Sequence, residues 1–185
     1  MTLLSQPAVL FITLTTSHCS KGVFNMADNS QYQNILVAVD GSKATAGVLE
    51  AGIKAALRNK AHLDILTITQ VDQLTDGYSD AGPSDDQTYS AVHATRGRMD
   101  DLKQKAQKAG VTDVSIHIRF GNPKRVIARE FPADHHSDLI VIGASGLSGV
   151  ERLMIGSVTN YVSRTAHCDV LVVRAAEGFQ KQSND

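Results

Sequence analysis

The chain has 185 residues, of which 42% are hydrophobic and 20% charged, and these values suit one soluble globular domain with a sizeable core. They exclude a disordered or fibrous chain. The formal net charge of -1 gives no bulk electrostatic reason to bind nucleic acid or an anionic membrane, so we expect neither as a partner. Cys19 and Cys168 lie far apart and outside any CxxC spacing, which indicates neither a disulfide framework nor a zinc site and favours a reducing, cytoplasmic location.

The first thirty residues differ from the rest of the chain. They contain the apolar run LLSQPAVLFITLTT, but no Lys or Arg precedes it and no clear cleavage site follows before Lys21. The run is also too short to span a bilayer as a helix. We therefore interpret residues 1–30 as a disordered extension, or as sequence upstream of a true start at Met26. A weak signal peptide or an interfacial anchor is the alternative.

From residue 34 onward, strand patterns alternate with helix patterns. Five strands are predicted, at residues 34–40, 62–69, 114–120, 138–143 and 169–174. Four helices are predicted between them: over 42–59, over 89–109 after a polar loop at 77–90, from Pro123, and from about Gly156. The first strand, NILVAVD, is almost continuously apolar, which is typical of parallel strands covered on both faces. The alternation predicts an α/β fold, an open five-stranded parallel sheet sandwiched by helices, Rossmann-like in class.

Glycines gather where these strands end. In open α/β sheets ligands bind beyond the carboxyl ends of the strands, so glycines there are of interest for function. Gly143 ends the fourth strand and Gly146 follows it, and both allow a tight turn and close approach of the backbone to a ligand. Each of them can also be a turn residue without a ligand.

A Gly-Ser pair opens the last predicted helix. The first backbone N–H groups of a helix lack internal partners and its dipole favours an anion, so phosphate is the expected ligand. Ser157 would offer its hydroxyl, and Val158 and Thr159 their backbone N–H groups. The alternative is that Ser157 is only a helix N-cap. The P-loop pattern GxxxxGK[ST] is absent, and DGSKAT follows the first strand in place of the dinucleotide pattern GxGxxG.

The spacing Gly-x2-Gly-x9-Gly-Ser, filled by Gly143, Gly146, Gly156 and Ser157, resembles the ATP-binding signature of the universal stress proteins. The stretches VAVDGS, GNP, SDLIVIGASG and CDVLVVR add to the resemblance. It implies a domain over residues 31–176, and the polar run at 177–185 is interpreted as a flexible tail. It also implies the strand order 3-2-1-4-5, ATP with Mg²⁺ as cofactor, and a homodimer joined through residues 169–174. The alternative for that edge is that the C-terminal tail folds back over it.

The same resemblance implies roles for residues on the first two strands. Asp40 would lie beside the ribose or the phosphate-bound magnesium, with an N-cap of the first helix as the alternative. Ala38 and Val39 would help to wall the adenine pocket. Ile68 matches the position whose backbone hydrogen-bonds adenine in the family.

No Ser-His-Asp arrangement or paired carboxylates point to a dedicated catalytic apparatus. We therefore expect an ATP-binding stress-response regulatory protein, a nucleotide-dependent homodimer with at most slow ATP hydrolysis or autophosphorylation; its client protein is not indicated. One alternative is an ATP-using enzyme of the adenine-hydrolase-like superfamily, although such enzymes carry an SGGxDS-like loop where this chain has VDGSKAT. Another is an interaction module with a vestigial pocket. His135 and His136 are interpreted as solvated, and His117 as facing outward or bordering a helix.

Overall fold

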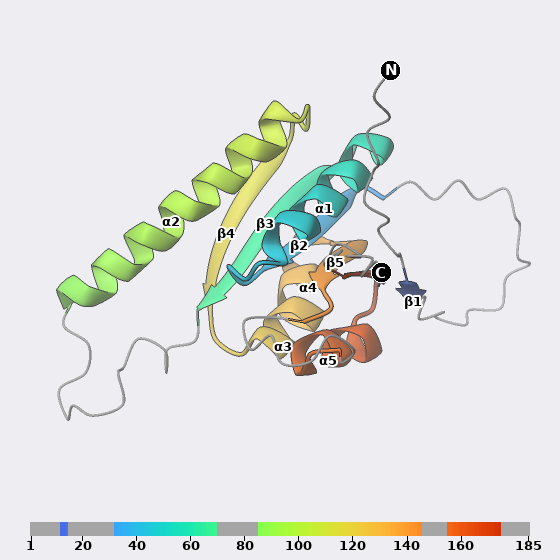
Figure 1. Ribbon diagram of the computed structural model, residues 1–185. Helices are drawn as coiled ribbons and strands as arrows, with labels where there is room; N and C mark the ends of the chain where they lie inside the picture. Colours follow the sequence, from blue (N-terminus) through green and yellow to red (C-terminus); the bar gives the residue numbers. More distant parts are fainter. Residues whose placement is uncertain (1–11, 15–31, 70–84, 146–154, 175–185) are drawn as a thin grey trace, which may run out of the picture.

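The computed structural model describes residues 12–14, 32–69, 85–145 and 155–174 (Figure 1). Its strands are β1 (Ile12–Leu14), β2 (Asn34–Val39), β3 (His62–Thr69), β4 (Val114–Phe120), β5 (Leu139–Gly143) and β6 (Asp169–Val173). Its helices are α1 (Thr45–Asn59), α2 (Asp85–Lys108), α3 (Pro123–Arg125), the π-helical turn η2 (Val126–Glu130), α4 (Phe131–His135) and α5 (Ser157–Thr165).

The sheet has the order β1-β6-β5-β2-β3-β4. The five strands from β2 to β6 are all parallel and in the order 3-2-1-4-5, as predicted. Strand β2 lies at the centre, with β3 on one side and β5 on the other. The strand order therefore reverses between β2 and β5, which is where an open α/β sheet forms a crevice for a ligand.

Two cores lie on the two faces of the sheet, because successive side chains of a strand point to opposite faces. Ile35 and Val37 of β2 face the core under α1 and α2, whereas Leu36 and Ala38 face the core under α3, η2, α4 and α5. The three residues Ile35, Leu36 and Val37 are fully buried. This double burial explains the continuous apolar run in the sequence.

The described helices lie where the sequence predicts them, but some of their ends differ. Helix α2 begins at Asp85, inside the stretch predicted as loop, where a serine and two acidic residues in the sequence are typical of a helix start. Phe120, the last residue of β4, is 50% exposed.

Strand β1 pairs antiparallel with the outer edge of β6, with Thr13 opposite Leu171. The sequence placed these three residues in an extension outside the domain. An edge strand exposes unpaired backbone groups, and a short antiparallel strand such as Ile12–Leu14 can satisfy them. In this structure the edge of β6 is therefore occupied by the chain's own N-terminal residues. The predicted tail at 177–185 lies outside the described residues.

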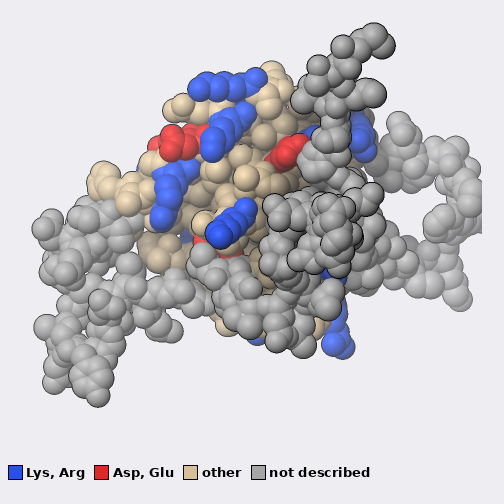
Figure 2. All heavy atoms as spheres, viewed as in Figure 1, with Lys and Arg blue, Asp and Glu red and all other residues tan. Residues whose placement is uncertain are grey.

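Charged side chains are mixed in sign on the face shown in Figure 2. Within α1, Lys54 pairs with Glu50 at 2.6 Å, and within α2, Arg96 lies 3.6 Å from Asp100. Such exposed pairs contribute little to stability. None of the described helices has the length and apolar character needed to cross a membrane.

Candidate functional site

A cavity of about 360 Å³ opens at the carboxyl ends of β2, β3 and β5. It lies at the reversal of strand order and within the size range of small-molecule sites. Its walls contain nine of the ten residues predicted from the sequence: Ala38, Val39, Asp40, Ile68, Gly143, Gly156, Ser157, Val158 and Thr159. The tenth, Gly146, lies outside the described residues.

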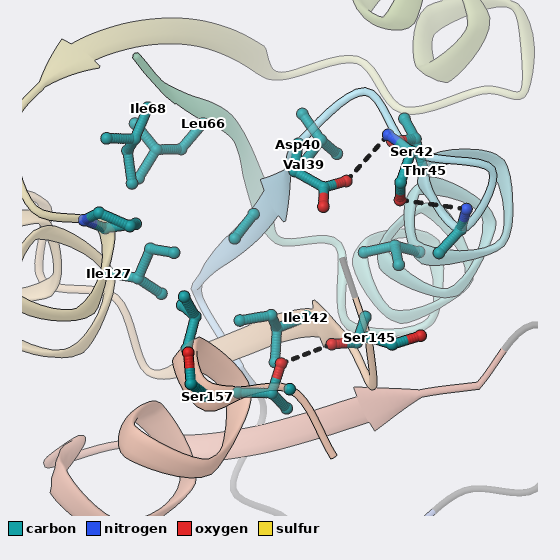
Figure 3. Close-up of a pocket in the computed structure, with 18 residues that line it drawn as sticks. Val39, Asp40, Ser42, Thr45, Leu66, Ile68, Ile127, Ile142, Ser145 and Ser157 are labelled. Atoms are coloured by element: carbon teal, nitrogen blue, oxygen red, sulfur yellow. Dashed lines mark hydrogen bonds between the residues drawn. The ribbon is translucent and has the colours of Figure 1, made fainter. Parts of the chain in front are cut away.

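One side of the cavity is apolar and the other polar (Figure 3). Leu66 and Ile68 of β3 and Ile127 of η2 form the apolar side, which suits a flat aromatic ring. Asp40 and Thr45 lie across from them, where β2 leads into α1. An elongated ligand with an apolar end and a charged end would match this division.

The turn after β2 is held by its own side chains. Asp40 Oδ1 accepts a hydrogen bond from the Ser42 backbone N–H at 3.0 Å, and Gly41 takes a positive φ of 77°. A glycine suits this conformation, because other L-residues adopt it less readily. Helix α1 has Ala44 as its N-cap, without a side-chain cap. Asp40 is therefore not the N-cap of α1, as one interpretation had it, but stabilises the turn with one carboxylate oxygen.

Helix α5 begins beside the cavity with Gly156 as its N-cap and without a side-chain cap. Its first intrahelical hydrogen bond runs from Asn160 N–H to Gly156 O at 2.9 Å. The backbone N–H groups of Ser157, Val158 and Thr159 precede that bond and have no acceptor within the helix. Ser157 is thus the first helical residue and not the N-cap, which corrects the alternative interpretation of this side chain.

Two hydrogen bonds fix the start of α5 against the end of β5. The Gly156 N–H donates to Ala144 O at 2.7 Å, and the Thr159 hydroxyl donates to Gly143 O at 2.6 Å. Thr159 is almost fully buried. These bonds hold the N-terminus of α5 in place, so the backbone donors keep their orientation toward the cavity.

Thr45 is a lining residue that the sequence analysis missed. Its Oγ1 is buried and has no hydrogen-bond partner in the described part of the chain. A buried hydroxyl without a partner is costly, so a ligand that supplies one would bind favourably. Thr45 ends the stretch DGSKAT, which follows the first strand. That position was the feature of the sequence that could have indicated its place in the cavity.

Charge in the cavity is sparse. Asp40 is the only ionisable side chain among the described lining residues, and no Lys, Arg or His joins it there. A phosphate would therefore meet backbone N–H groups and hydroxyls on this part of the wall. A divalent cation that accompanies phosphates is commonly held by one or two carboxylates, and Asp40 fits that requirement.

A second polar cluster lies on the same face of the sheet, away from the cavity. Asp64 of β3 is 2% exposed, and His62, His117 and His135 surround its carboxylate. Burial favours a higher pKa for Asp64, but hydrogen bonds from His117 and His62 outweigh burial and lower it. Burial likewise favours a lower pKa for His62, but hydrogen bonds to Asp64 and Asp113 raise it.

His117 and His135 both pack against Phe131 of α4. His117 borders a helix, with its ring 4.9 Å from that of Phe131. His135 was expected to be solvated, but its ring stacks on Phe131 at 4.0 Å and is 28% exposed, because α4 ends over the sheet. The neighbouring His136 is exposed.

Comparison with known proteins adds four relationships. Residues 31–174 match the model of the universal stress protein family. A sequence described as a universal stress protein of Staphylococcus aureus (strain USA300) is 40% identical over 155 residues, which is 82% of this chain and 91% of that one. The structure of universal stress protein UspA from Lactobacillus plantarum has a TM-score of 0.62 and 30% identity, covering 79% of this chain and 100% of that chain. The structure of a universal stress protein in complex with cAMP has a TM-score of 0.58 and 26% identity, covering 78% of this chain and 98% of that chain.

Proposed function

The chain belongs to the universal stress protein family, and from this premise we propose that it is an ATP-binding regulatory protein of the cytoplasm, with Mg²⁺ accompanying the nucleotide. The observation that carries the proposal is the uncapped N-terminus of α5, which is held against the end of β5 and forms one wall of the cavity. Three backbone donors at that position suit a phosphate group.

The apolar side of the cavity suits adenine. Ile68, Leu66 and Ile127 offer apolar surface for a ring, and the backbone of β3 at Ile68 offers hydrogen-bonding groups to its edge. A family member binds cAMP, which supports an adenine nucleotide as the ligand class. Asp40 would hold the ribose or the magnesium, and Thr45 would gain a partner for its buried hydroxyl.

The described lining residues favour binding over catalysis. A hydrolase needs a group that orients water and a charge that stabilises the γ-phosphate in the transition state. Asp40 is the only ionisable group on the described wall, so we propose at most slow hydrolysis or autophosphorylation. Signalling would then depend on the bound nucleotide, through a homodimer in which β6 pairs with its copy.

The test is a calorimetric titration of the chain with MgATP, AMP and cAMP, together with mass spectrometry of the nucleotide that co-purifies. The double variant Gly156→Val with Ser157→Ala should weaken MgATP binding by roughly 100-fold or more, because charge-assisted hydrogen bonds of about 1.5–3 kcal/mol each are lost. Gly156 has φ -59° and ψ 154°, which valine adopts without strain, so the fold should persist.

Asn160→Ala provides the matched control, since Asn160 is exposed on the same helix. Its affinity for MgATP should equal that of the wild type. Unchanged MgATP affinity in the double variant would remove α5 as the phosphate site. Failure of the wild type to bind any of the three nucleotides would reject the proposed function itself.

A further inference from the structure

The cluster around Asp64 has no part in the proposed nucleotide site, and its composition is unusual. Asp64 lies in the strand HLDILTIT between Leu63 and Ile65, both fully buried. A buried carboxylate needs strong partners, and such partners are commonly Arg or Lys. In the described part of the chain, Asp64 forms its ion pairs with histidines alone.

Three of these side chains come together from three separate elements. His117 of β4 places Nε2 at 2.7 Å from Asp64 Oδ1, and His135 at the end of α4 places Nδ1 at 3.9 Å from Asp64 Oδ2. One ligand atom from each of Asp64, His117 and His135 lies within 4.8 Å of the others. Ligand atoms of one tetrahedral zinc ion are about 3.3 Å apart, given bond lengths of about 2.0–2.2 Å. His117 Nε2 is already closer than this to Asp64 Oδ1, so its ring would move outward slightly, whereas the ring of His135 would rotate inward.

We propose that Asp64, His117 and His135 form a binding site for one Zn²⁺ ion or a similar divalent transition-metal ion. Two imidazoles and one carboxylate are the ligand set of many zinc sites with an open fourth position. Mg²⁺ and Ca²⁺ prefer oxygen ligands and would bind here poorly. Because His117 and His135 are 23% and 28% exposed, water can reach the fourth position.

His62 would orient the carboxylate ligand from the other side. Its Nε2 lies 3.0 Å from Asp64 Oδ1, and its Nδ1 lies 2.9 Å from Asp113 Oδ1. Metal sites commonly hold their ligands by such outer hydrogen bonds. His62 is therefore a positioning residue in this proposal.

Among the described residues near this cluster, Arg119 opposes the binding of a cation. Its Nη2 lies 3.5 Å from His135 Nε2 and 3.6 Å from Asp134 Oδ2. When Nδ1 of His135 binds the metal, Nε2 carries the proton, so Arg119 must turn away toward Asp134. Arg119→Gln should therefore bind Zn²⁺ more tightly than the wild type, because a nearby positive charge is removed.

The site is separate from the nucleotide cavity although β3 contributes to both. Asp64 precedes Leu66 and Ile68 on the same face of the strand, and Asp64, His117 and His135 do not line the cavity. Zn²⁺ would join β3, β4 and α4. Its binding should therefore raise the melting temperature whether or not nucleotide is present.

The experiment uses the tag-free chain, stripped with a chelator and desalted. Calorimetric titration with ZnCl₂ should give one site per chain, and CoCl₂ should produce the visible absorption of a low-symmetry cobalt site. MgCl₂ should produce neither signal. The Gly156→Val/Ser157→Ala variant should bind Zn²⁺ as the wild type does, which separates this site from the nucleotide cavity.

Substitutions at His117 and His135, compared with one at the neighbouring His136, identify the ligands of the metal ion. His135→Asn and His117→Gln should each weaken Zn²⁺ binding by at least about tenfold. His136→Asn is the control: His136 is exposed and has a φ of 53°, a conformation that asparagine tolerates. Circular dichroism checks that each variant is folded. Equal Zn²⁺ affinity in the His135 and His136 variants, or no stoichiometric binding by the wild type, would overturn the proposal.

Discussion

The hydroxyl of Thr159 donates a hydrogen bond to the carbonyl oxygen of Gly143 at 2.6 Å and so joins the first turn of α5 to the last residue of β5. Both residues line the cavity. The bond couples the stability of the domain to the geometry of the proposed phosphate site.

Thr159→Val removes this donor and preserves the shape of the side chain. The Gly143 carbonyl would then lose its hydroxyl partner, which should lower the free energy of unfolding by about 1–3 kcal/mol. MgATP affinity should fall as well, because the N-terminus of α5 is released. Urea denaturation and calorimetry measure the two effects.

Ser163→Ala serves as the control for that variant. The Ser163 hydroxyl donates to Thr159 O at 2.7 Å within the same helix, and such bonds add little to helix stability. MgATP affinity should therefore stay unchanged. If the Thr159 and Ser163 variants lose affinity equally, the effect belongs to α5 as a whole and not to its bond with Gly143.

Gly52 allows α1 to approach β2 closely. A Cβ at this position would overlap Cγ2 of Val37, whose side chain is fully buried. Alanine normally stabilises a helix by about 1 kcal/mol over glycine. Here overpacking, which costs about 1–3 kcal/mol, should outweigh that gain, so Gly52→Ala should lower the melting temperature.

Gly47→Ala is the matched change in the same helix. A Cβ at Gly47 would meet no atom within 4 Å, so the gain in helix propensity of about 0.5–1 kcal/mol should appear in full. Thermal denaturation should thus rank the three proteins as Gly47→Ala, wild type, Gly52→Ala. Stabilisation by both alanines would mean that β2 and α1 are less closely packed than in this structure.

The regular core was predictable because its patterns are local. The bounds of β3 and β4 agree with the sequence analysis, since both segments are rich in Val, Ile and Thr, which favour strands. Strand β1 was not predictable in that way, because its partner β6 lies near the other end of the chain and a run of three residues carries little signal.

The nucleotide cavity and the Asp64 cluster also differ in how far their residues could be predicted from local sequence. Gly143, Gly156 and Ser157 stand at the ends of predicted elements and at a recognisable spacing, so the sequence indicated their edge of the cavity. Asp64 and the histidines come from β3, β4 and α4, and only the packing of α4 on the sheet brings them together. The spacing of His135 and His136 in sequence therefore suggested no metal site.

Tyr32 provides a test of how the start of the domain packs on β6. Its hydroxyl donates to Asp169 Oδ2 at 2.7 Å, and burial together with this bond raises its pKa to about 12. The neutral phenol is the form that the fold favours. Its stabilising effect should therefore be complete below pH 10, the ordinary pKa, and should disappear as the pH rises toward 12.

Ultraviolet titration can isolate this group, since the chain has four tyrosines. The wild type should show one phenol with a raised pKa that is missing from Tyr32→Phe. The stability difference between the two proteins should shrink between pH 10 and pH 12. A wild-type titration identical in shape to that of the variant would show that the bond to Asp169 is not formed.

The last prediction concerns the outer edge of β6, which two partners could occupy. In this structure β1 pairs there, with Thr13 opposite Leu171, whereas the proposed homodimer pairs β6 with its copy. Both cannot use the same backbone groups. Removing residues 1–30 should therefore strengthen dimerisation, which light scattering across a range of concentrations would measure.

MgATP affinity should not change on this truncation, because no residue of β1 is among the described residues that line the cavity. Leu171→Pro in the truncated chain is the control, since proline cannot donate a hydrogen bond to a neighbouring strand and should prevent the dimer. Circular dichroism shows whether that variant is folded. Equal dimerisation constants for the full and truncated chains would mean that β1 does not compete for β6, because competition requires the free edge to become available when β1 is removed.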